Sequence, residues 1–431
     1  MNTFTMDKNC FEKLPPEILI NILKLLSLKD LRNVMITSKY LKDLITNESS
    51  LWKFICRYKL IINHNNSIKE SSKSWYTNCR LSHNWCKGIF KNKILIQNQT
   101  KFLPWMQLVH TNVLLVSFGS DLDCFSLEPP RYSKRLIWKI NVPTTRRYDI
   151  RTNDVTRFIV KDNLIVCGNR DGNTAIYEYN NIREKPYLLH YIQNCHNCGK
   201  EEVTAVEKTK NCVITASNLS PYINLWNLKG NTLGSQLNNC SIVKNFEVPE
   251  CDGCWSLSVD ALGKNLAIGL NGNGMPACID LNIGQYVMSP KQDLRGKKHL
   301  VRDLQWHNTN GIVFVTHSGK LQYIDTRVGS VTYEIRDPFQ SALYCVKTDG
   351  DNAVVTGSAE YSRCVLFDLR SPHHVQMFFT QKKSSPIYSL DFDVKKLIAA
   401  GDQRVAVANF NVSSRSTEAK DYSQIFEFVS S

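Results

Sequence analysis

Two pairs of cysteines have the spacing that metal ligands often show. Cys195 and Cys198 flank a His-Asn dipeptide, and Cys251 and Cys254 flank Asp-Gly, so each pair is a C-x-x-C unit. Four thiolates bind Zn²⁺ tetrahedrally when the fold brings two such pairs together. The stretch between the pairs, residues 199–250, is much longer than in a compact zinc module. The two interpretations are a zinc site between neighbouring repeats and a set of unlinked thiols.

Basic side chains recur in loops that precede predicted strands. Arginine pairs with carboxylate or phosphate through parallel hydrogen bonds, and clusters of arginine recognise acidic or phosphorylated segments. These loops therefore predict a binding surface for an acidic or phosphorylated protein, with a solvated basic rim as the alternative. The candidate substrate-binding residues are Arg146, Arg147, Arg151, Arg295, Lys297, Lys298, Arg302, Lys382 and Lys383.

The sequence contains no arrangement of residues that predicts catalysis. It has no P-loop, no nucleophile elbow and no G-x-G-x-x-G opening a helix. Its ten histidines form no H-E-x-x-H or similar set of metal ligands. We therefore expect a binding protein that is not an enzyme and needs no cofactor.

The net charge and the hydropathy pattern limit the class of protein further. The chain has 53 Lys and Arg against 39 Asp and Glu, a formal charge of +14, which indicates acidic partners or a solvated basic surface. The first residues lack the apolar core of a signal peptide, and no apolar run approaches the roughly 18 residues of a membrane span. We expect a cytoplasmic or nuclear protein without membrane contact, and reduced cysteines.

The basic loops and the cysteine pairs lie within a repeated pattern that begins at Pro104. In each unit, an alternating strand is followed by an apolar segment that ends in a small residue, and then by another alternating strand. Repeats of about 40–50 residues with several short strands are typical of WD-type β-propellers. We therefore predict a mainly β fold, a seven-bladed WD-repeat propeller. The small residues of the seven units are Ser117, Gly168, Ser217, Gly269, Thr316, Gly357 and Gly401.

The repeats depart from the usual WD pattern in two ways. The Trp-Asp dipeptide is never intact, with Trp226-Asn227 as its nearest form, and the usual Gly-His is absent. We therefore do not expect the buried hydrogen-bond network of those residues in most blades. The last blade also needs an outermost strand, because an open edge invites misassembly. The early segment 91–97 is the expected closing strand, and the segment QIFEFV at 424–429 is its competitor.

Residues 11–60 predict a small all-α module. Ile18, Leu19, Ile22 and Leu25 recur at helical spacing and form one apolar stripe. A module of this size with so much apolar surface is marginal on its own and needs a partner. The predicted domains are this module, a partly helical linker over 61–90 and the propeller over 91–431.

The module also resembles the F-box. The strings LPPEIL, SLKDLRNVMITSKYLKDL and SLWKFI match the whole motif in register. The resemblance implies docking on a Skp-type adaptor that bridges to a cullin scaffold. Ile22, Leu25 and Leu44 are expected instead to fill the core of the module. The adaptor-binding residues that the resemblance implies are Leu14, Pro15, Ile18, Leu19, Leu28, Leu31, Val34 and Trp52.

The rest of the chain resembles the family of F-box/WD repeat-containing protein 4 (dactylin). The strings SHNW, PWMQL, LYCVKTDG and SSPIYSLDF carry this resemblance, and PWMQL and LYCVKTDG are not required by a generic WD repeat. It implies a substrate receptor of an SCF-type cullin-RING ubiquitin ligase, whose propeller binds the protein to be ubiquitinated and sent to the proteasome. The alternative is a basic propeller scaffold or RNA-associated protein. The F-box string favours the first function, so we do not expect a nucleic-acid partner.

Overall fold

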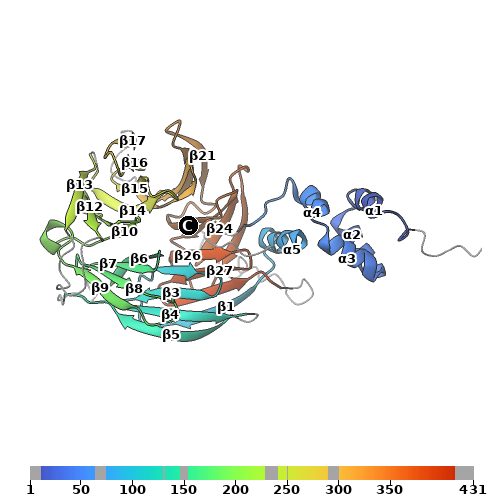
Figure 1. Ribbon diagram of the computed structural model, residues 1–431, viewed down its shortest axis with the longest axis horizontal. Coiled ribbons are helices and arrows are strands. Elements are labelled where there is room, and N and C mark those ends of the chain that lie inside the picture. Colours follow the sequence, from blue (N-terminus) through green and yellow to red (C-terminus); the bar gives the residue numbers. More distant parts are fainter. Residues whose placement is uncertain are drawn as a thin grey trace, which may run out of the picture.

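The computed structural model describes residues 11–63, 74–129, 132–145, 154–228, 241–249, 251–289 and 300–412. It consists of a helical module at the N-terminal side and a ring of seven β-sheets (Figure 1). The mainly β class, the helical module and the seven-bladed propeller predicted from the sequence are confirmed. Within the described residues, no helix has the length and apolar character needed to cross a membrane.

The helical module contains four short helices, and a fifth helix follows after a connecting segment. Ser27 caps the start of the second helix: its Oγ accepts a hydrogen bond from the Asp30 N–H and donates one to the Asp30 carboxylate. Pro16 lies in the first turn of the first helix, where its missing N–H costs nothing. The helices are α1 (Pro16–Leu23), α2 (Leu28–Thr37), α3 (Lys39–Asn47), α4 (Ser49–Cys56) and α5 (Trp75–Cys86).

The first three blades are antiparallel sheets whose four strands follow each other in the chain. Blade 1 contains β2 (Met106–Val109), β3 (Val113–Phe118), β4 (Asp121–Glu128) and β5 (Ser133–Asn141). Blade 2 contains β6 (Val155–Lys161), β7 (Leu164–Asn169), β8 (Thr174–Glu178) and β9 (Tyr187–Ile192). Blade 3 contains β10 (Ala205–Lys208), β11 (Cys212–Ser217), β12 (Ser220–Asn227) and β13 (Ile242–Glu247).

The next three blades repeat this order. Blade 4 contains β14 (Gly253–Val259), β15 (Asn265–Asn271), β16 (Ala277–Asp280) and β17 (Tyr286–Met288). Blade 5 contains β18 (Val301–Asn308), β19 (Gly311–Thr316), β20 (Lys320–Asp325) and β21 (Ser330–Arg336). Blade 6 contains β22 (Leu343–Thr348), β23 (Ala353–Ser358), β24 (Arg363–Asp368) and β25 (His374–Phe379).

Blade 7 combines both ends of the propeller. Its strands are β26 (Ile387–Asp393), β27 (Lys396–Gly401), β28 (Arg404–Asn409) and β1 (Lys91–Gln97). β1 pairs antiparallel with β28, from Lys91 opposite Asn409 to Gln97 opposite Arg404. The early segment therefore closes the ring, as the sequence predicts. The competing segment 424–429 lies outside the described residues.

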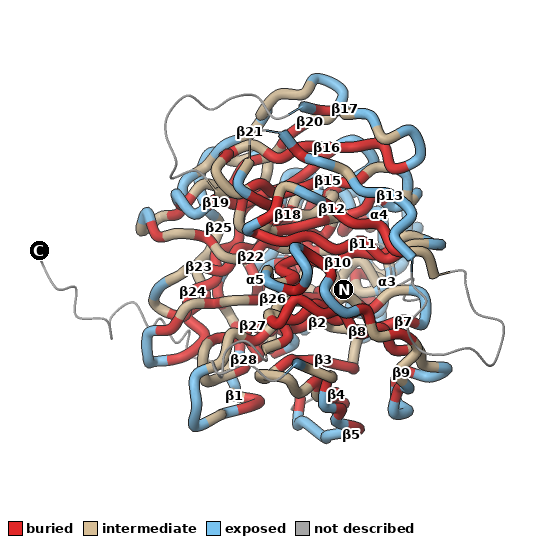
Figure 2. The backbone as a smooth tube through the Cα atoms, turned by 90° about the vertical axis from the view of Figure 1, so that its left-hand side faces the viewer, coloured by how far each residue is buried: buried red, intermediate tan, exposed pale blue. Residues whose placement is uncertain are grey.

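The second strands of the blades are more buried than the innermost and the outermost strands. The first strands of neighbouring blades contact each other around the axis. The second strands, such as β7, β19 and β23, are buried along their whole length, whereas the outermost strand β13 is exposed at most positions (Figure 2). The core is thus a set of apolar layers between successive blades.

Polar side chains of the innermost strands join one blade to the next. Gln107 exchanges two hydrogen bonds with the backbone of Val160, through its Oε1 at 2.9 Å and its Nε2 at 3.2 Å. The Asp391 carboxylate accepts the N–H of Leu108 at 2.8 Å, and thus links blade 7 to blade 1. Similar bonds join Ser258 to Trp306, Asp303 to Val346 and Gln305 to Thr348. These contacts couple the blades without the Trp-Asp dipeptides.

Blade 3 keeps part of the hydrogen-bond network that is usual in WD repeats. In blade 3, the Thr215 hydroxyl accepts the indole N–H of Trp226 at 3.0 Å and lies 3.1 Å from His196 Nε2. His196 is buried, and burial lowers its pKa to about 4, so the ring is neutral at pH 7. The histidine was missed because the residue before it is Cys195, not glycine.

Ring closure can be tested by placing a charge in β1. The Ile96 side chain is buried in the apolar layer that joins blades 1 and 7. Ile96→Asp should destabilise the propeller by on the order of 3 kcal/mol, because the carboxylate loses its hydration without gaining a partner. The midpoint of urea unfolding measures this effect. Gln97→Asp, at the exposed neighbouring position, is the control, and equal midpoints for the two variants would contradict the closure by β1.

Candidate functional site

A pocket of about 130 Å³ lies where the seven innermost strands begin. Each of the seven blades contributes one lining residue, which stands at the start of its innermost strand or directly before it. The pocket therefore lies on the axis of the ring. These seven residues are Trp105, Thr156, Thr204, Trp255, Arg302, Tyr344 and Tyr388. Leu103, Pro104, Arg157, Arg170 and Glu202 complete the lining. We refer to this cavity as the axial pocket.

A local irregularity of the backbone directs side chains into the axial pocket. In five blades, the pairing of the innermost strand with the next strand shifts at the second residue of the repeat, as in a β-bulge. A bulged residue has no partner in the ladder, and its side chain is re-aimed. All five shifted residues line the pocket, and they are Thr156, Trp255, Arg302, Tyr344 and Tyr388.

Arg302 is the central side chain of this group. Its guanidinium carbon lies 4.2 Å from the ring centre of Trp255 and 4.7 Å from that of Tyr344. Tyr344 in turn stacks on Tyr388, with ring centres 5.9 Å apart. Burial lowers the pKa of Arg302 from its ordinary value, which reflects the cost of holding a cation away from water. Contacts of this kind between a cation and aromatic rings stabilise the cation in place.

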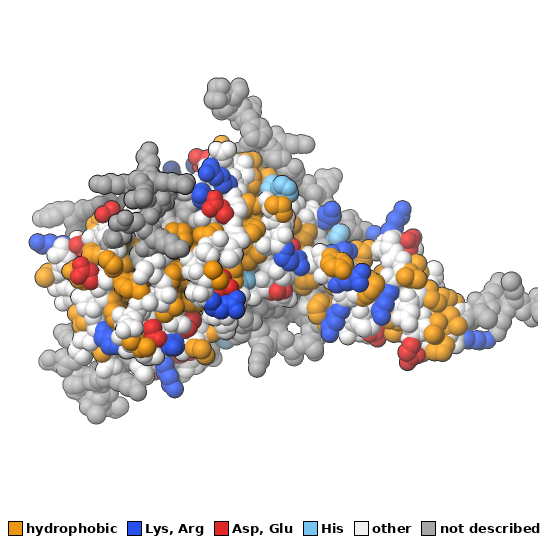
Figure 3. Space-filling model, turned by 90° about the horizontal axis from the view of Figure 1, so that it is seen from above, with side chains coloured by type: hydrophobic (Ala, Val, Ile, Leu, Met, Phe, Trp, Pro, Cys, Tyr) orange, Lys and Arg blue, Asp and Glu red, His pale blue; other side chains and the backbone are white. Residues whose placement is uncertain are grey.

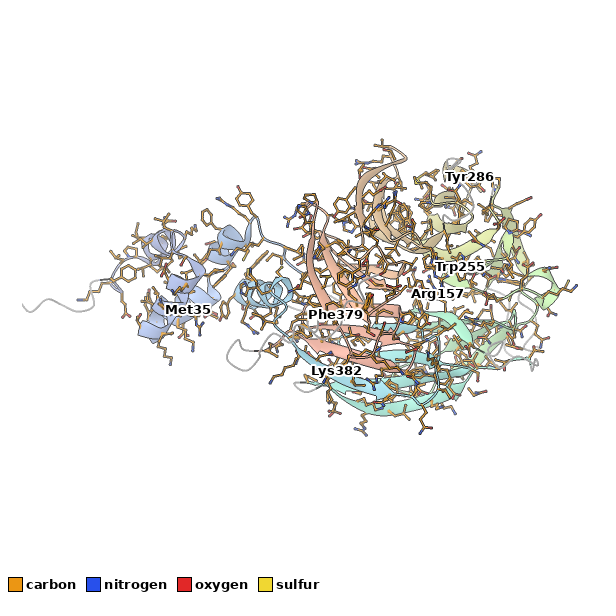
Figure 4. The ribbon with its side chains drawn as sticks, turned by 180° about the vertical axis from the view of Figure 1, so that it is seen from behind. Met35, Arg157, Trp255, Tyr286, Phe379 and Lys382 are labelled. Carbon is orange, nitrogen blue, oxygen red and sulfur yellow. The ribbon has the colours of Figure 1, made fainter. Side chains whose placement is uncertain are left out.

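The other two arginines of the axial pocket have carboxylate partners. Arg157 lies 3.0 Å from the Asp303 carboxylate, across the ring between blades 2 and 5, and stacks on Trp105 at 4.0 Å. Arg170 lies 3.9 Å from the Glu202 carboxylate. Figure 4 shows Arg157 and Trp255 near each other in the middle of the ring.

Only three of the nine predicted basic residues lie in the described part of the chain. Arg302 lines the axial pocket, and Lys382 and Lys383 are exposed in the loop before β26 (Figure 4). The other six, Arg146, Arg147, Arg151, Arg295, Lys297 and Lys298, lie outside the described residues. The sequence analysis missed the aromatic residues around Arg302. An alignment of the seven repeats would find these residues, because they stand at equivalent positions at the start of their repeats.

Of the two interpretations of the cysteine pairs, the described residues contradict the zinc site and leave unlinked thiols. Cys195 is buried and its thiol donates to the Thr174 hydroxyl at 3.3 Å, whereas Cys198 is exposed. Cys251 and Cys254 interact with each other, and a hydrogen bond between the thiols lowers the pKa of Cys251. Among the described residues, no three His, Cys, Asp or Glu side chains are grouped so as to hold a metal ion. The hypothesis of four convergent thiolates is therefore wrong. Cys195 precedes the structural His196, and Cys254 belongs to the apolar core of blades 3 and 4.

The predicted adaptor-binding residues separate into buried and accessible groups. Leu19, Leu31 and Trp52 are buried, and the Trp52 indole N–H donates to the backbone carbonyl of Ile45 at 2.7 Å. These three side chains hold the helices together. Leu14 and Val34 are half-buried, and the remaining predicted residues are exposed. The exposed residues are Pro15, Ile18 and Leu28.

The module also exposes apolar side chains outside the predicted adaptor-binding set. Leu25 is 83% exposed, so its assignment to the core is wrong: it follows the last residue of α1 by two and faces away from the other helices. Ile36 is 70% exposed on α2. Figure 3 shows hydrophobic side chains beside Lys and Arg on the surface of the module. Exposed apolar groups of this density are typical of a docking surface.

Helix α5 packs against the helical module with one end and the propeller with the other (Figure 1). Near its start, Cys79 lies in the core of the module, and the Trp52 and Tyr76 rings are 5.1 Å apart. Near its end, Trp85 is fully buried, stacks on Phe410 at 3.8 Å and donates its indole N–H to the Val394 carbonyl at 2.9 Å. The helix therefore couples the two parts by burial and hydrogen bonds. The domain limits at residues 60 and 90 remain a prediction.

The sequence is similar to known proteins along most of its length. Residues 11–58 match the F-box-like family model. The chain is 24% identical to F-box/WD repeat-containing protein 4 of Mus musculus, over 92% of this chain and 93% of that protein. It is 24% identical to F-box/WD repeat-containing protein 4 of Homo sapiens, over 92% of each. The F-box resemblance that LPPEIL indicates and the resemblance to this family that PWMQL indicates are thus confirmed. Among solved structures, the computationally designed Ika8 protein matches 73% of this chain and 98% of its own, at 16% identity and a TM-score of 0.49.

Substitution of Trp85 tests the coupling through α5. Trp85→Ala should lower the free energy of unfolding by about 3–5 kcal/mol and make the connection to the module sensitive to protease. Trp85→Phe retains an aromatic ring for the stack on Phe410 but loses the hydrogen bond to Val394, and should cost about 1 kcal/mol. Urea unfolding and limited proteolysis measure the two effects. Equal behaviour of both variants and the wild type would contradict the coupling.

A buried carboxyl group of the innermost strands predicts a dependence of stability on pH. Burial raises the pKa of Glu207 from 4.5 to about 7, in spite of Lys161 and Lys347 nearby. The folded chain therefore keeps this proton up to about pH 7, whereas the unfolded chain releases it near pH 4.5. The contribution of Glu207 to the free energy of unfolding therefore falls as the pH rises from 4.5 to about 7, by up to about 1.4 kcal/mol per pH unit.

Glu207→Gln removes this titration and keeps the shape of the side chain. Relative to the wild type, the variant should be more stable at pH 8 than at pH 5, because only the wild type must ionise a buried group. Urea unfolding at the two pH values measures the difference. The same relative stability at both would show that the folded chain does not raise the pKa of Glu207.

Proposed function

We propose that this chain is the substrate-recognition subunit of an SCF-type cullin-RING ubiquitin ligase. The observation that carries the proposal is an F-box-like module with exposed apolar residues, coupled through α5 to a closed propeller with a lined axial pocket. The similarity to F-box/WD repeat-containing protein 4 over most of the chain supports it. The module docks on a Skp adaptor that bridges to a cullin, and the propeller binds the protein to be ubiquitinated.

The accessible apolar side chains of the module form the proposed adaptor contact. Pro15, Ile18 and Leu28 are exposed, and Leu14 and Val34 are partly accessible beside them. Leu25 extends this surface. Burial of a few such anchors supplies most of the binding free energy in an interface. Leu19, Leu31 and Trp52 act indirectly, because their burial fixes the helices that present these anchors.

In this function the chain is not the catalyst. The ligase chemistry comes from partner subunits, and the receptor raises the local concentration of the substrate beside an activated ubiquitin. A rigid connection between the module and the propeller increases this local concentration, because it holds the substrate at a defined distance from the adaptor. The basic loops and Arg302 form the proposed substrate surface, suited to an acidic or phosphorylated segment.

Co-purification of the tagged chain with the Skp adaptor and the cullin tests the proposal. Leu14→Ala should weaken adaptor binding by about 2 kcal/mol, roughly thirtyfold, and Ile18→Asp should abolish capture, because a charge replaces an apolar anchor. Tyr58→Ala is the control, since Tyr58 is 82% exposed on the same module but outside the proposed contact. If the wild-type chain captures no adaptor, or if Ile18→Asp captures as much as the wild type, the proposal fails.

A further inference from the structure

The axial pocket contains one cation that has no anionic partner in the described part of the chain. The Arg302 guanidinium contacts the faces of Trp255 and Tyr344, and no described oxygen accepts a hydrogen bond from it. A partly buried cation that lacks such acceptors raises the free energy of the folded chain. A ligand that brings an anion to Arg302 recovers part of this cost.

The charges around the pocket define how much negative charge it accepts. Arg157 is paired with Asp303 at 3.0 Å, and Arg170 with Glu202 at 3.9 Å. Among the described residues of this cluster, three guanidinium groups thus face two carboxylates, which leaves one positive charge, that of Arg302. The balance favours a ligand group with a single negative charge.

Trp255, which lines the same pocket, carries a second hydrogen-bond donor. The indole N–H of Trp255 is buried, and the structure provides no acceptor for it. Buried N–H groups are almost always paired, so an unpaired one marks a place where an acceptor from outside is expected. Trp255 is also the residue on whose face Arg302 lies. One acceptor group with two oxygens, placed beside Arg302, can pair with both donors.

We propose that the axial pocket binds a single carboxylate of a protein ligand, through the Arg302 guanidinium and the Trp255 indole N–H. The rings of Tyr344, Tyr388 and Trp105 pack against the carbon atoms next to that carboxylate. With about 130 Å³, the pocket is smaller than the roughly 300–1,000 Å³ of small-molecule sites, so it takes one group of a larger ligand. This inference rests on the proposed function in that the ligand is the substrate of the ligase.

Charge distinguishes this carboxylate from a phosphate. A phosphorylated side chain carries a charge of about −1.5 to −2 at pH 7, more than the one unpaired guanidinium balances. Its extra charge would also lie near the carboxylates of Glu202 and Asp303. The planar guanidinium matches the geometry of a carboxylate in paired hydrogen bonds. The carboxylate can come from an Asp or Glu side chain or from the C-terminus of the ligand.

Ligand-observed NMR titrations of the full-length chain with four small probes test the proposal. N-acetyl-phenylalanine presents a terminal carboxylate, and N-acetyl-phenylalanyl-glutamic acid with its α-carboxyl group amidated presents only a side-chain carboxylate. N-acetyl-phenylalaninamide is the neutral match, and phenyl phosphate is the dianion. At least one carboxylate probe should bind, and the tighter of the two identifies the source. The amide and phenyl phosphate should each bind at least about tenfold more weakly, a difference of about 1.4 kcal/mol.

Variants of the pocket complete the test. Arg302→Gln should abolish carboxylate binding, and Arg302→Lys, which keeps the charge but not the planar fork, should weaken it about tenfold. Trp255→Phe keeps an aromatic ring and removes the N–H, and should weaken binding severalfold. Lys185→Gln, an exposed cation in the loop between β8 and β9 that lies outside the proposed substrate surface, is the control and should bind like the wild type. Thermal unfolding of each variant verifies the fold.

Three results would overturn the inference: phenyl phosphate binding as tightly as the carboxylates, unchanged carboxylate binding by folded Arg302→Gln, or no binding of any probe at millimolar concentration. Adaptor capture separates this failure from that of the proposed function. Capture of the adaptor without probe binding removes the carboxylate site and leaves the receptor role. Probe binding without adaptor capture leaves the site and removes the receptor role.

Discussion

The antiparallel pairing of β1 with β28 closes the ring of sheets, and the other features of the molecule depend on that closure. Without β1, the last blade would present an unpaired strand edge, and the apolar layer between blades 1 and 7 would be open to water. β1 also begins shortly after α5 ends, with only residues 87–90 between them. The strand that closes the propeller therefore directly follows the helix that anchors the helical module to it.

Closure also creates the axial pocket. Its lining takes one residue from the start of each repeat, so the pocket exists only when all seven blades are in place. The polar links between innermost strands, such as Gln107 to Val160 and Asp391 to Leu108, keep the strands in register around the axis. The bulges then direct Trp255, Arg302 and Tyr344 into the pocket. The binding site is in this sense a property of the whole ring and not of one blade.

Much of this architecture follows from patterns in the sequence, and the rest depends on contacts that no local pattern contains. The repeat period predicted seven blades, and the need to cover the open edge of the last blade predicted the closing strand at residues 91–97. The helical stripe predicted α1 but placed Leu25 in the core, since periodicity cannot tell where a helix ends.

The errors at the candidate sites have similar causes. The C-x-x-C spacing suggested zinc, whereas burial of Cys195 and Cys254 in separate layers keeps the four thiols from converging. The aromatic environment of Arg302 comes from residues far apart in the chain, Trp255 and Tyr344, which only the closed ring brings together. The shared position of these residues in their repeats is visible in the sequence. That they meet around one axis follows only from the closed ring.

The measurement that most directly tests the coupling of the two binding faces is the distance distribution between the module and the propeller in solution. Spin labels on unnatural amino acids at Lys42 in α3 and Lys210 after β10, both exposed, avoid the native thiols. Pulsed electron–electron double resonance should give one narrow distribution, because α5 is packed into the cores of both parts. A broad distribution, or two separate distances, would show that the module moves independently of the propeller and would contradict this coupling.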